Sequence, residues 1–205
     1  MGLFAFLFKT PLGIIISIFS GLIGLVLIAG AGVAAMALTG GPGPCTPGGG
    51  AIEISDAQAQ SFDTKWDWLD APLAGGGSSS ITLTESEIGS RANKYIDDKG
   101  GDVDDIRVCI HDGYGEVTGS VDVAVGSGKF KAKGAVALNG GRPVVDFQDI
   151  ELGNVPGFAL GPLEGAVEDA IQELLDDITL EHTYAPSLSE GQAEIDGTPG
   201  LSGGL

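Results

Sequence analysis

Residues 103–152 read VDDIRVCIHDGYGEVTGSVDVAVGSGKFKAKGAVALNGGRPVVDFQDIEL, and apolar side chains recur in them at every second position. Ile106, Val108 and Ile110 show this alternation clearly. A period of two indicates β-strands with one buried face and one solvated face. The sequence therefore predicts an antiparallel meander, whose expected hairpin turns are the glycine-containing segments 112–115, 126–128 and 139–141.

The fourth strand of this meander is expected from Pro143 to about Leu152. Its apolar side chains change parity between Phe147 and Ile150. An extra residue in one strand of a pair shifts the parity in this way. We therefore predict a β-bulge there.

Helical patterns precede the meander. Ser55 or Asp56 is suited to cap a helix that runs to about Asp70, and Thr84 with Glu87 forms a capping box for a second helix from Glu85 to about Ile96. The first helix has one apolar face, made by Ala59, Phe62, Trp66 and Leu69. Trp68 lies off this face, which leaves two interpretations: packing at the domain edge or contact with a membrane interface.

Further elements are expected after the meander. Pro162 is suited to the first turn of a third helix that ends at Asp177 and has a broad apolar face. A closing hairpin follows, with residues 180–184 on one strand, 186–191 as the turn and 193–195 on the return. The fold class is therefore α+β, with a curved antiparallel sheet packed on amphipathic helices in a single domain over residues 51–197, and 198–205 form a flexible tail.

An uncharged apolar segment lies near the N-terminus. Residues 12–38 read LGIIISIFSGLIGLVLIAGAGVAAMAL, and no charged residue occurs between Lys9 and Glu53. This length exceeds the roughly 20 residues that a helix needs to cross a bilayer. A single transmembrane helix is expected, with residues 1–11 in the cytoplasm and the acidic remainder outside it. Cleavage as a signal peptide near Ala35–Ala37 is the alternative, although the apolar segment is longer than usual for that role.

Residues 39–50, TGGPGPCTPGGG, predict a flexible spacer, because glycine makes order entropically costly and proline interrupts helices. This spacer contains Cys45, and the second cysteine, Cys109, lies in a predicted strand. A disulfide and two unpaired thiols are both compatible with the sequence, because pairing depends on Cα atoms within about 7 Å.

The charge balance and the absence of known motifs make several classes of function less favourable for this chain. The chain has 10 Lys and Arg against 28 Asp and Glu, a net charge of −18, which disfavours a nucleic-acid partner. Neither His111 nor His182 lies in a recognisable metal or triad pattern. The segment GSGK, residues 126–129, does not match a phosphate loop, because it lacks the upstream glycine and Phe130 stands where a Ser or Thr is required. We therefore expect no enzyme activity, no cofactor and no metal site.

Lys129, Lys131 and Lys133 alternate with Phe130 and Ala132, so the three ammonium groups are expected on one strand face. This lysine row is the main anion-attracting feature of the sequence. It has two interpretations: contact with lipid headgroups, or a solvated sheet face that deters edge association.

Three further segments support a family resemblance: ITLTESEIGSRANKYI at 81–96, ELGNVPGFALGPLEGAVEDAIQELLDD at 151–177 and YAPSLSEGQAEIDG at 184–197. Together with the strand meander between the first two, they resemble the YpmS/LmeA-like membrane-anchored lipid-binding proteins, relatives of the tubular lipid-binding (TULIP-like) fold. The resemblance covers roughly residues 52–197 and implies an apolar groove for acyl chains between a curved sheet and a long helix. The short length departs from full-sized tubular domains.

The resemblance and the apolar faces together give candidate groove residues, each of which is also suited to an ordinary core. They are Val121, Val123, Phe130, Val136, Phe147, Phe158, Leu163, Val167, Ile171 and Leu174. The leading hypothesis is a noncatalytic, tethered extracytoplasmic protein that binds or handles membrane lipid. The alternative is an accessory or structural subunit of a larger membrane complex, whose transmembrane helix packs against a protein partner.

Overall fold

A computed structural model of the chain describes residues 40–99, 103–123, 126–139, 142–154 and 182–199. The predicted transmembrane segment 12–38, the predicted cytoplasmic segment 1–11 and the predicted third helix 162–177 lie outside these residues. None of the helices in the described ranges is long and apolar enough to cross a membrane.

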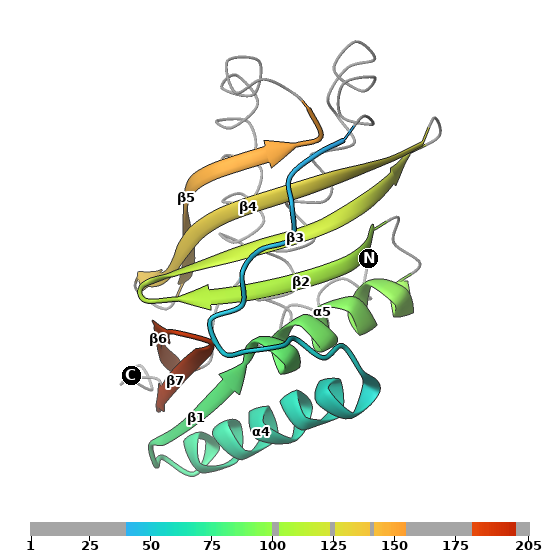
Figure 1. Ribbon diagram of the computed structural model, residues 1–205. Coiled ribbons are helices and arrows are strands. Elements are labelled where there is room, and N and C mark those ends of the chain that lie inside the picture. The colour runs from blue at the N-terminus through green and yellow to red at the C-terminus, as the bar shows by residue number, and fades with distance from the viewer. Residues whose placement is uncertain (1–39, 100–102, 124–125, 140–141, 155–181, 200–205) are drawn as a thin grey trace, which may run out of the picture.

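The described residues form an α+β fold with two antiparallel sheets and two helices (Figure 1). The helices are α4 (Asp56–Ala74) and α5 (Glu85–Lys99). A four-stranded sheet has the order β2-β3-β4-β5, with β2 (Val103–His111), β3 (Tyr114–Val123), β4 (Gly126–Asn139) and β5 (Arg142–Leu152). A three-stranded sheet has the order β1-β7-β6, with β1 (Ser79–Thr84), β6 (Thr183–Ser189) and β7 (Gln192–Thr198).

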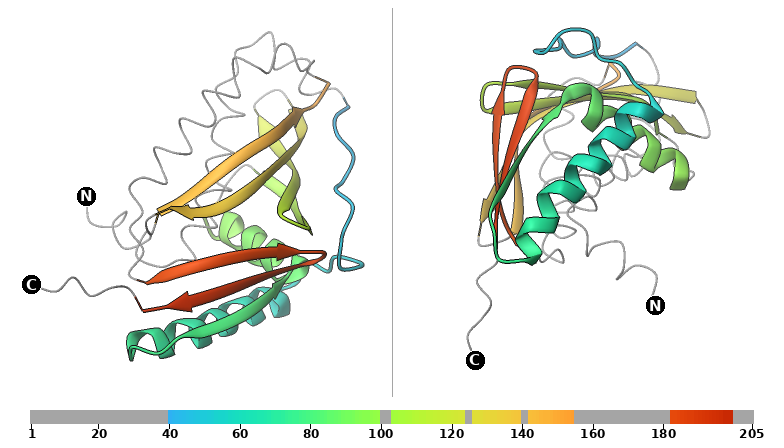
Figure 2. Two further views of the ribbon diagram at one scale, coloured as in Figure 1. Left: turned by 90° about the vertical axis from the view of Figure 1, so that its left-hand side faces the viewer. Right: turned by 90° about the horizontal axis from the view of Figure 1, so that it is seen from below.

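Both helices lie on the inner side of the angle between the two sheets (Figure 2). The core fills this angle. Phe62, Leu69 and Leu73 of α4 and Ile88 and Ile96 of α5 are buried there against apolar side chains of both sheets. The sheet is therefore not one continuous curved surface, as the sequence predicted, but two sheets that share one core.

The capping predictions for both helices are confirmed. The Ser55 hydroxyl accepts a hydrogen bond from the Gln58 N–H at 3.3 Å. In α5, the Thr84 N–H donates to Glu87 Oε2 at 2.9 Å and the Glu87 N–H donates to Thr84 Oγ1 at 3.3 Å. The helices extend beyond their predicted ends, to Ala74 and Lys99, and α4 continues through Pro72.

Glu87 also joins the two helices. Its carboxylate accepts from Ser61 at 2.6 Å and from Lys65 Nζ at 2.7 Å, both on α4. Burial by itself would raise the pKa of this carboxyl, but the hydrogen bonds from Lys65, Ser61 and the Thr84 N–H, together with the charge of Lys65, lower the pKa below its usual value of 4.5.

We expect this carboxyl to make folding stability pH-dependent. A carboxyl whose folded pKa is depressed contributes stability above its unfolded pKa and loses that contribution as the pH falls through the folded value. Glu87→Gln should therefore destabilise the protein at neutral pH, and the difference from wild type should shrink below about pH 4.5. Urea unfolding over a pH series measures this, and a difference that stays constant down to low pH would refute the assignment.

The predicted meander is confirmed in part. The bulge is present, because Lys133 pairs with Asp149 whereas Gly134 pairs with Phe147, which leaves Gln148 as the extra residue. The segment 126–128 is not a turn: Gly126 pairs with Val123 and begins β4, so the connection is shorter than predicted. A glycine suits a turn, but it also fits a strand whose neighbours approach closely.

Three predictions in the second sheet are wrong. The sequence predicts a linker over residues 74–80, between the two helices, but residues 79–80 belong to β1, which pairs with β7 so that Ile81 faces Ile195. Pro186, expected in the final turn, lies within β6 and opposite Ile195. A proline is tolerated there because β6 is an edge strand of its sheet. Thr198, expected in the tail, ends β7, and residues 200–205 lie outside the described part of the chain.

Candidate functional site

Residues 40–50, which we call the strap, cross the outer face of the four-stranded sheet from the β5 side past β4 and β3 to β2 (Figure 1). The sequence predicted a flexible spacer here. Instead, Cys45 is buried and forms a disulfide with Cys109 of β2, with Cα atoms 6.0 Å apart. Composition alone could not reveal this attachment, because the partner is 64 residues away.

A buried carboxylate holds the strap at a second point. Glu85 is 3 % exposed, and its Oε1 accepts from the Gly48 N–H at 2.9 Å and from the Ile110 N–H at 2.7 Å. Its Oε2 accepts from the Gly49 N–H at 3.1 Å. One carboxylate at the start of α5 therefore joins the strap to β2. No local pattern indicates this role, because acids are common in the first turn of a helix.

Glycine residues let the strap lie close to the turn between β6 and β7. The Gly191 N–H donates to the Ile110 carbonyl at 2.9 Å, and a Cβ at Gly191 would overlap the backbone of Gly48 and Gly49. Gly191 also has φ +76°, a value that other L-residues rarely adopt. The strap can therefore approach the β6–β7 turn only because both surfaces lack side chains.

We expect Gly191→Ala to destabilise the protein by roughly 2–4 kcal/mol, because it adds both backbone strain and an overlap with the strap. Gly113→Ala is the matched control: Gly113 has φ +80° but open space where a Cβ would stand. Gly113→Ala should lower the free energy of unfolding by roughly 1 kcal/mol, because it adds backbone strain but no overlap. Chemical denaturation compares the two variants, and equal losses would show that the strap does not press on Gly191.

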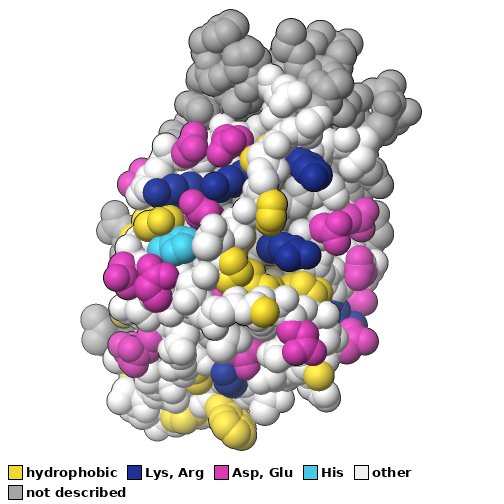
Figure 3. Space-filling view, viewed as in Figure 1, with side chains coloured by type: hydrophobic (Ala, Val, Ile, Leu, Met, Phe, Trp, Pro, Cys, Tyr) yellow, Lys and Arg dark blue, Asp and Glu magenta, His cyan; other side chains and the backbone are white. Residues whose placement is uncertain are grey.

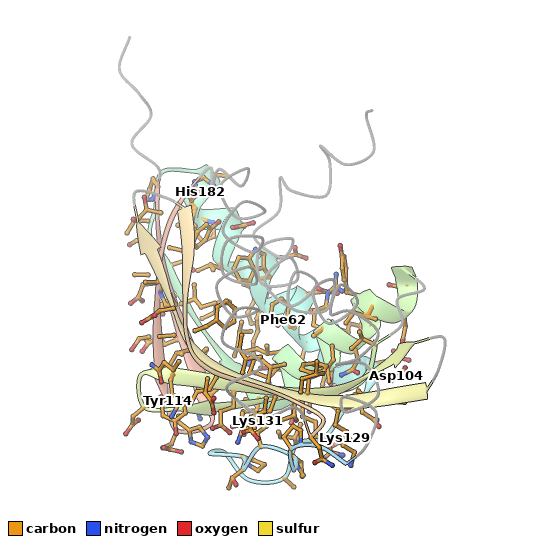
Figure 4. The ribbon with its side chains drawn as sticks, turned by 90° about the horizontal axis from the view of Figure 1, so that it is seen from above. Phe62, Asp104, Tyr114, Lys129, Lys131 and His182 are labelled. Carbon is orange, nitrogen blue, oxygen red and sulfur yellow. A yellow bond between two sulfur atoms is a disulfide. The ribbon has the colours of Figure 1, made fainter. Side chains whose placement is uncertain are left out.

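Lys and Arg side chains lie over the face that the strap crosses (Figure 3), and Figure 4 places Lys129 and Lys131 of the lysine row on this outer side of the sheet. Phe130 and Ala132 point to the opposite face and are buried, as predicted. Lys131 Nζ lies 3.5 Å from Glu116 Oε2, and Lys133 Nζ lies 3.8 Å from the centre of the Tyr114 ring. Lys129 is exposed, and its Cβ lies beside Gly41 at the start of the strap. The ammonium groups of Lys131 and Lys133 therefore lie beside a carboxylate and an aromatic ring of the same domain. Lys129 lies beside the first residues of the strap.

The candidate groove residues are only partly placed. Phe130 is buried in the core and Phe147 of β5 is half-buried. Val121 and Val123 lie in β3 and Val136 lies in β4. The remaining candidates lie outside the described residues: Phe158, Leu163, Val167, Ile171 and Leu174.

An aromatic row on the inner side of the fold was not anticipated. Trp66 of α4 stacks on Phe62 with ring centroids 5.9 Å apart and meets Tyr184 of β6 at 5.8 Å. His182 meets the other edge of Tyr184 at 6.3 Å, and the Tyr184 hydroxyl donates to Asp70 Oδ1 at 2.5 Å. Figure 4 shows Phe62 and His182 on the inner side of the sheets, away from the lysine row. The row joins residues more than a hundred positions apart in the sequence, so no local pattern could predict it.

Two nitrogens in this row lack hydrogen-bond partners. Within the described part of the chain, the buried side-chain polar atoms without a partner are Trp66 Nε1 and His182 Nδ1. Trp66 is 7 % exposed, and its indole nitrogen can only donate. A buried donor left unpaired costs roughly 1–3 kcal/mol, and any polar group that pairs with it, a water molecule included, removes that cost.

The other histidine is part of a surface cluster. His111 Nδ1 lies 3.3 Å from Glu190 Oε2, and the His111 ring lies 4.9 Å from the Tyr114 ring. The described residues contain no group of three or more His, Cys, Asp or Glu side chains arranged to hold a metal ion.

Comparisons with known protein families, with curated proteins and with solved structures found no match. Three features of the described residues are available for a functional proposal: the strap with its disulfide, the lysine row and the aromatic row with its two unpaired nitrogens.

Proposed function

We propose that the chain is a noncatalytic protein anchored by a transmembrane helix at residues 12–38, whose domain binds or handles lipid outside the cytoplasm. The observation that carries the location is the Cys45–Cys109 disulfide, which follows directly after the apolar segment. Structural disulfides form and persist in oxidising compartments and are rare in the cytosol. Lys9 before the apolar segment and acidic residues after it favour the same orientation.

The aromatic row supports lipid binding. A lipid whose polar group lay near Trp66 Nε1 and His182 Nδ1 would pair both nitrogens, and its acyl chain would have to fit among rings that are already buried in the core. The resemblance to the YpmS/LmeA-like proteins points to the same class of ligand. We place the lipid on the inner side of the sheets, where the row lies.

Brominated lipids test this proposal, because bromine quenches tryptophan fluorescence only at short range. The full chain is reconstituted in phosphatidylcholine vesicles whose acyl chains are brominated. The variants Trp68→Phe and Trp66→Phe each leave one reporter, buried Trp66 in the first and Trp68, which is 69 % exposed, in the second. We expect strong quenching of Trp66 and weak quenching of Trp68.

Weak quenching of both tryptophans in a chain that stays in the vesicles would overturn lipid binding on the aromatic row. The alternative, an accessory subunit, would then be favoured if a stable complex were recovered from native membranes through residues 12–38. Its basis is the set of small residues in that segment, including Gly21, Gly24 and Gly30, which permit close helix packing.

A further inference from the structure

The strap begins on the domain surface almost immediately after the apolar segment. A Cβ on Gly40 would lie 2.7 Å from the Asn154 side chain, and one on Gly41 would lie 2.8 Å from Lys129 Cβ. Leu38 and Gly41 are three residues apart, so even a fully extended chain between them spans at most about 11 Å. The end of the proposed transmembrane helix therefore lies close to Lys129, and this statement rests on the proposed function.

The strap is fixed at successive points after that beginning. The disulfide holds Cys45, and Glu85 holds Gly48 and Gly49. Farther along, the Ser86 hydroxyl accepts from the Glu53 N–H and the Ser90 hydroxyl accepts from the Ser55 N–H, both at 3.0 Å. The strap is thus held to the domain from Cys45 onward, which leaves only a short length of chain between the domain and the apolar segment.

We infer that the strap seats one end of the four-stranded sheet on the lipid headgroup layer. This end consists of Ser127 and Lys129 at the start of β4 and Asn154 after β5, and we call it the seating end. In Figure 1 it lies at the top, where the strap begins, and α4 lies at the bottom.

The seating end carries charges of both signs. Ser127, Lys129 and Asn154 are all exposed, and Lys129 adds a positive charge. Exposed Asp104 of β2 lies in the same row across the sheet, because Asp104 pairs with Ser120 and Ser120 pairs with Lys129. The opposite side presents α4, whose exposed and half-buried acids include Asp56, Asp63, Asp67 and Asp70. The short tether, rather than charge, therefore selects the seating end. In this orientation Trp68 of α4 faces away from the membrane, which favours the domain-edge interpretation of its exposure.

Photo-crosslinking to lipid tests the orientation. The full chain, with p-benzoylphenylalanine in place of Ser127 or, separately, of Trp68, is reconstituted in vesicles of phosphatidylcholine with a minority of phosphatidylglycerol. Both positions are exposed, so the comparison is between two ends of one surface. We expect roughly a tenfold excess of lipid adducts at Ser127, because the short tether keeps that end at a high effective concentration near the headgroups. Equal adducts, or more at Trp68, would overturn the inference.

A flexible Gly/Ser insertion between Thr39 and Gly40 is the matched control. It leaves the strap, the disulfide and the Glu85 hydrogen bonds intact but lengthens the tether, so the excess at Ser127 should fall markedly. An excess that survives the insertion would show that the tether does not set the orientation. The outcome is separable from the proposed function: loss of the chain from the vesicles contradicts the anchor, whereas a retained chain without the excess contradicts only the orientation.

Discussion

Removing the disulfide should lower the free energy of unfolding by roughly 4 kcal/mol, the amount expected when a cross-link between residues 64 positions apart no longer restricts the unfolded chain. The double variant Cys45→Ala/Cys109→Ala is the appropriate change, because it leaves no unpaired thiol. Both sulfurs are buried, so loss of their packing adds to the effect. Urea unfolding under oxidising conditions measures the loss.

Reductant provides the control for this prediction. Wild type treated with dithiothreitol should unfold near the urea concentration of the double variant, and the double variant itself should not respond. A wild-type transition that reductant leaves unchanged would contradict a structural role for the bond.

Replacing the carboxylate that clamps the strap should have an effect of similar size. Glu85→Ala removes the acceptor of three backbone N–H groups, one of which, on Ile110, is buried. We expect a loss of roughly 3–5 kcal/mol, because hydrogen bonds to a charged acceptor are lost and a buried donor stays unpaired. Chemical denaturation measures the loss, and limited proteolysis should show new cleavage near Gly48 and Gly49.

Glu85→Gln is a milder change. It keeps one acceptor oxygen but places an amide N–H₂ group against a backbone donor, so we expect the free energy of unfolding to fall by roughly 1–3 kcal/mol. Glu53→Gln makes the same chemical change on an exposed side chain and should stay within about 0.5 kcal/mol of wild type. If Glu85→Gln and Glu53→Gln have the same free energy of unfolding, the hydrogen bonds from the strap to Glu85 contribute nothing to stability.

The helices and strands that depend on residues close together in the sequence could be predicted. The capping box of Thr84 and Glu87, the apolar stripe through Phe62 and the alternation around Phe130 each depend on residues close in sequence. The bulge at Gln148 also left a local sign, because it shifts the parity of the strand.

The features that depend on distant partners were not predictable. The strap looked like a flexible spacer because Gly and Pro are abundant in it, yet the same glycines allow it to lie against Gly191. Strand β1 was missed because it is short and its partner, β7, is more than a hundred residues later in the chain. The contact between Trp66 and Tyr184 joins α4 and β6, which are more than a hundred residues apart in the sequence.

The position of the domain relative to the membrane is the most direct test of the account. An epitope tag at the C-terminus of the full chain is probed in intact and in permeabilised cells, and the membranes are then extracted with alkaline carbonate. We predict that antibody binds the tag without permeabilisation and that the chain stays in the carbonate-resistant pellet. A tag reached only after permeabilisation, on a chain that carbonate releases, would contradict a helix at residues 12–38 that holds a disulfide-bonded domain outside the cytoplasm.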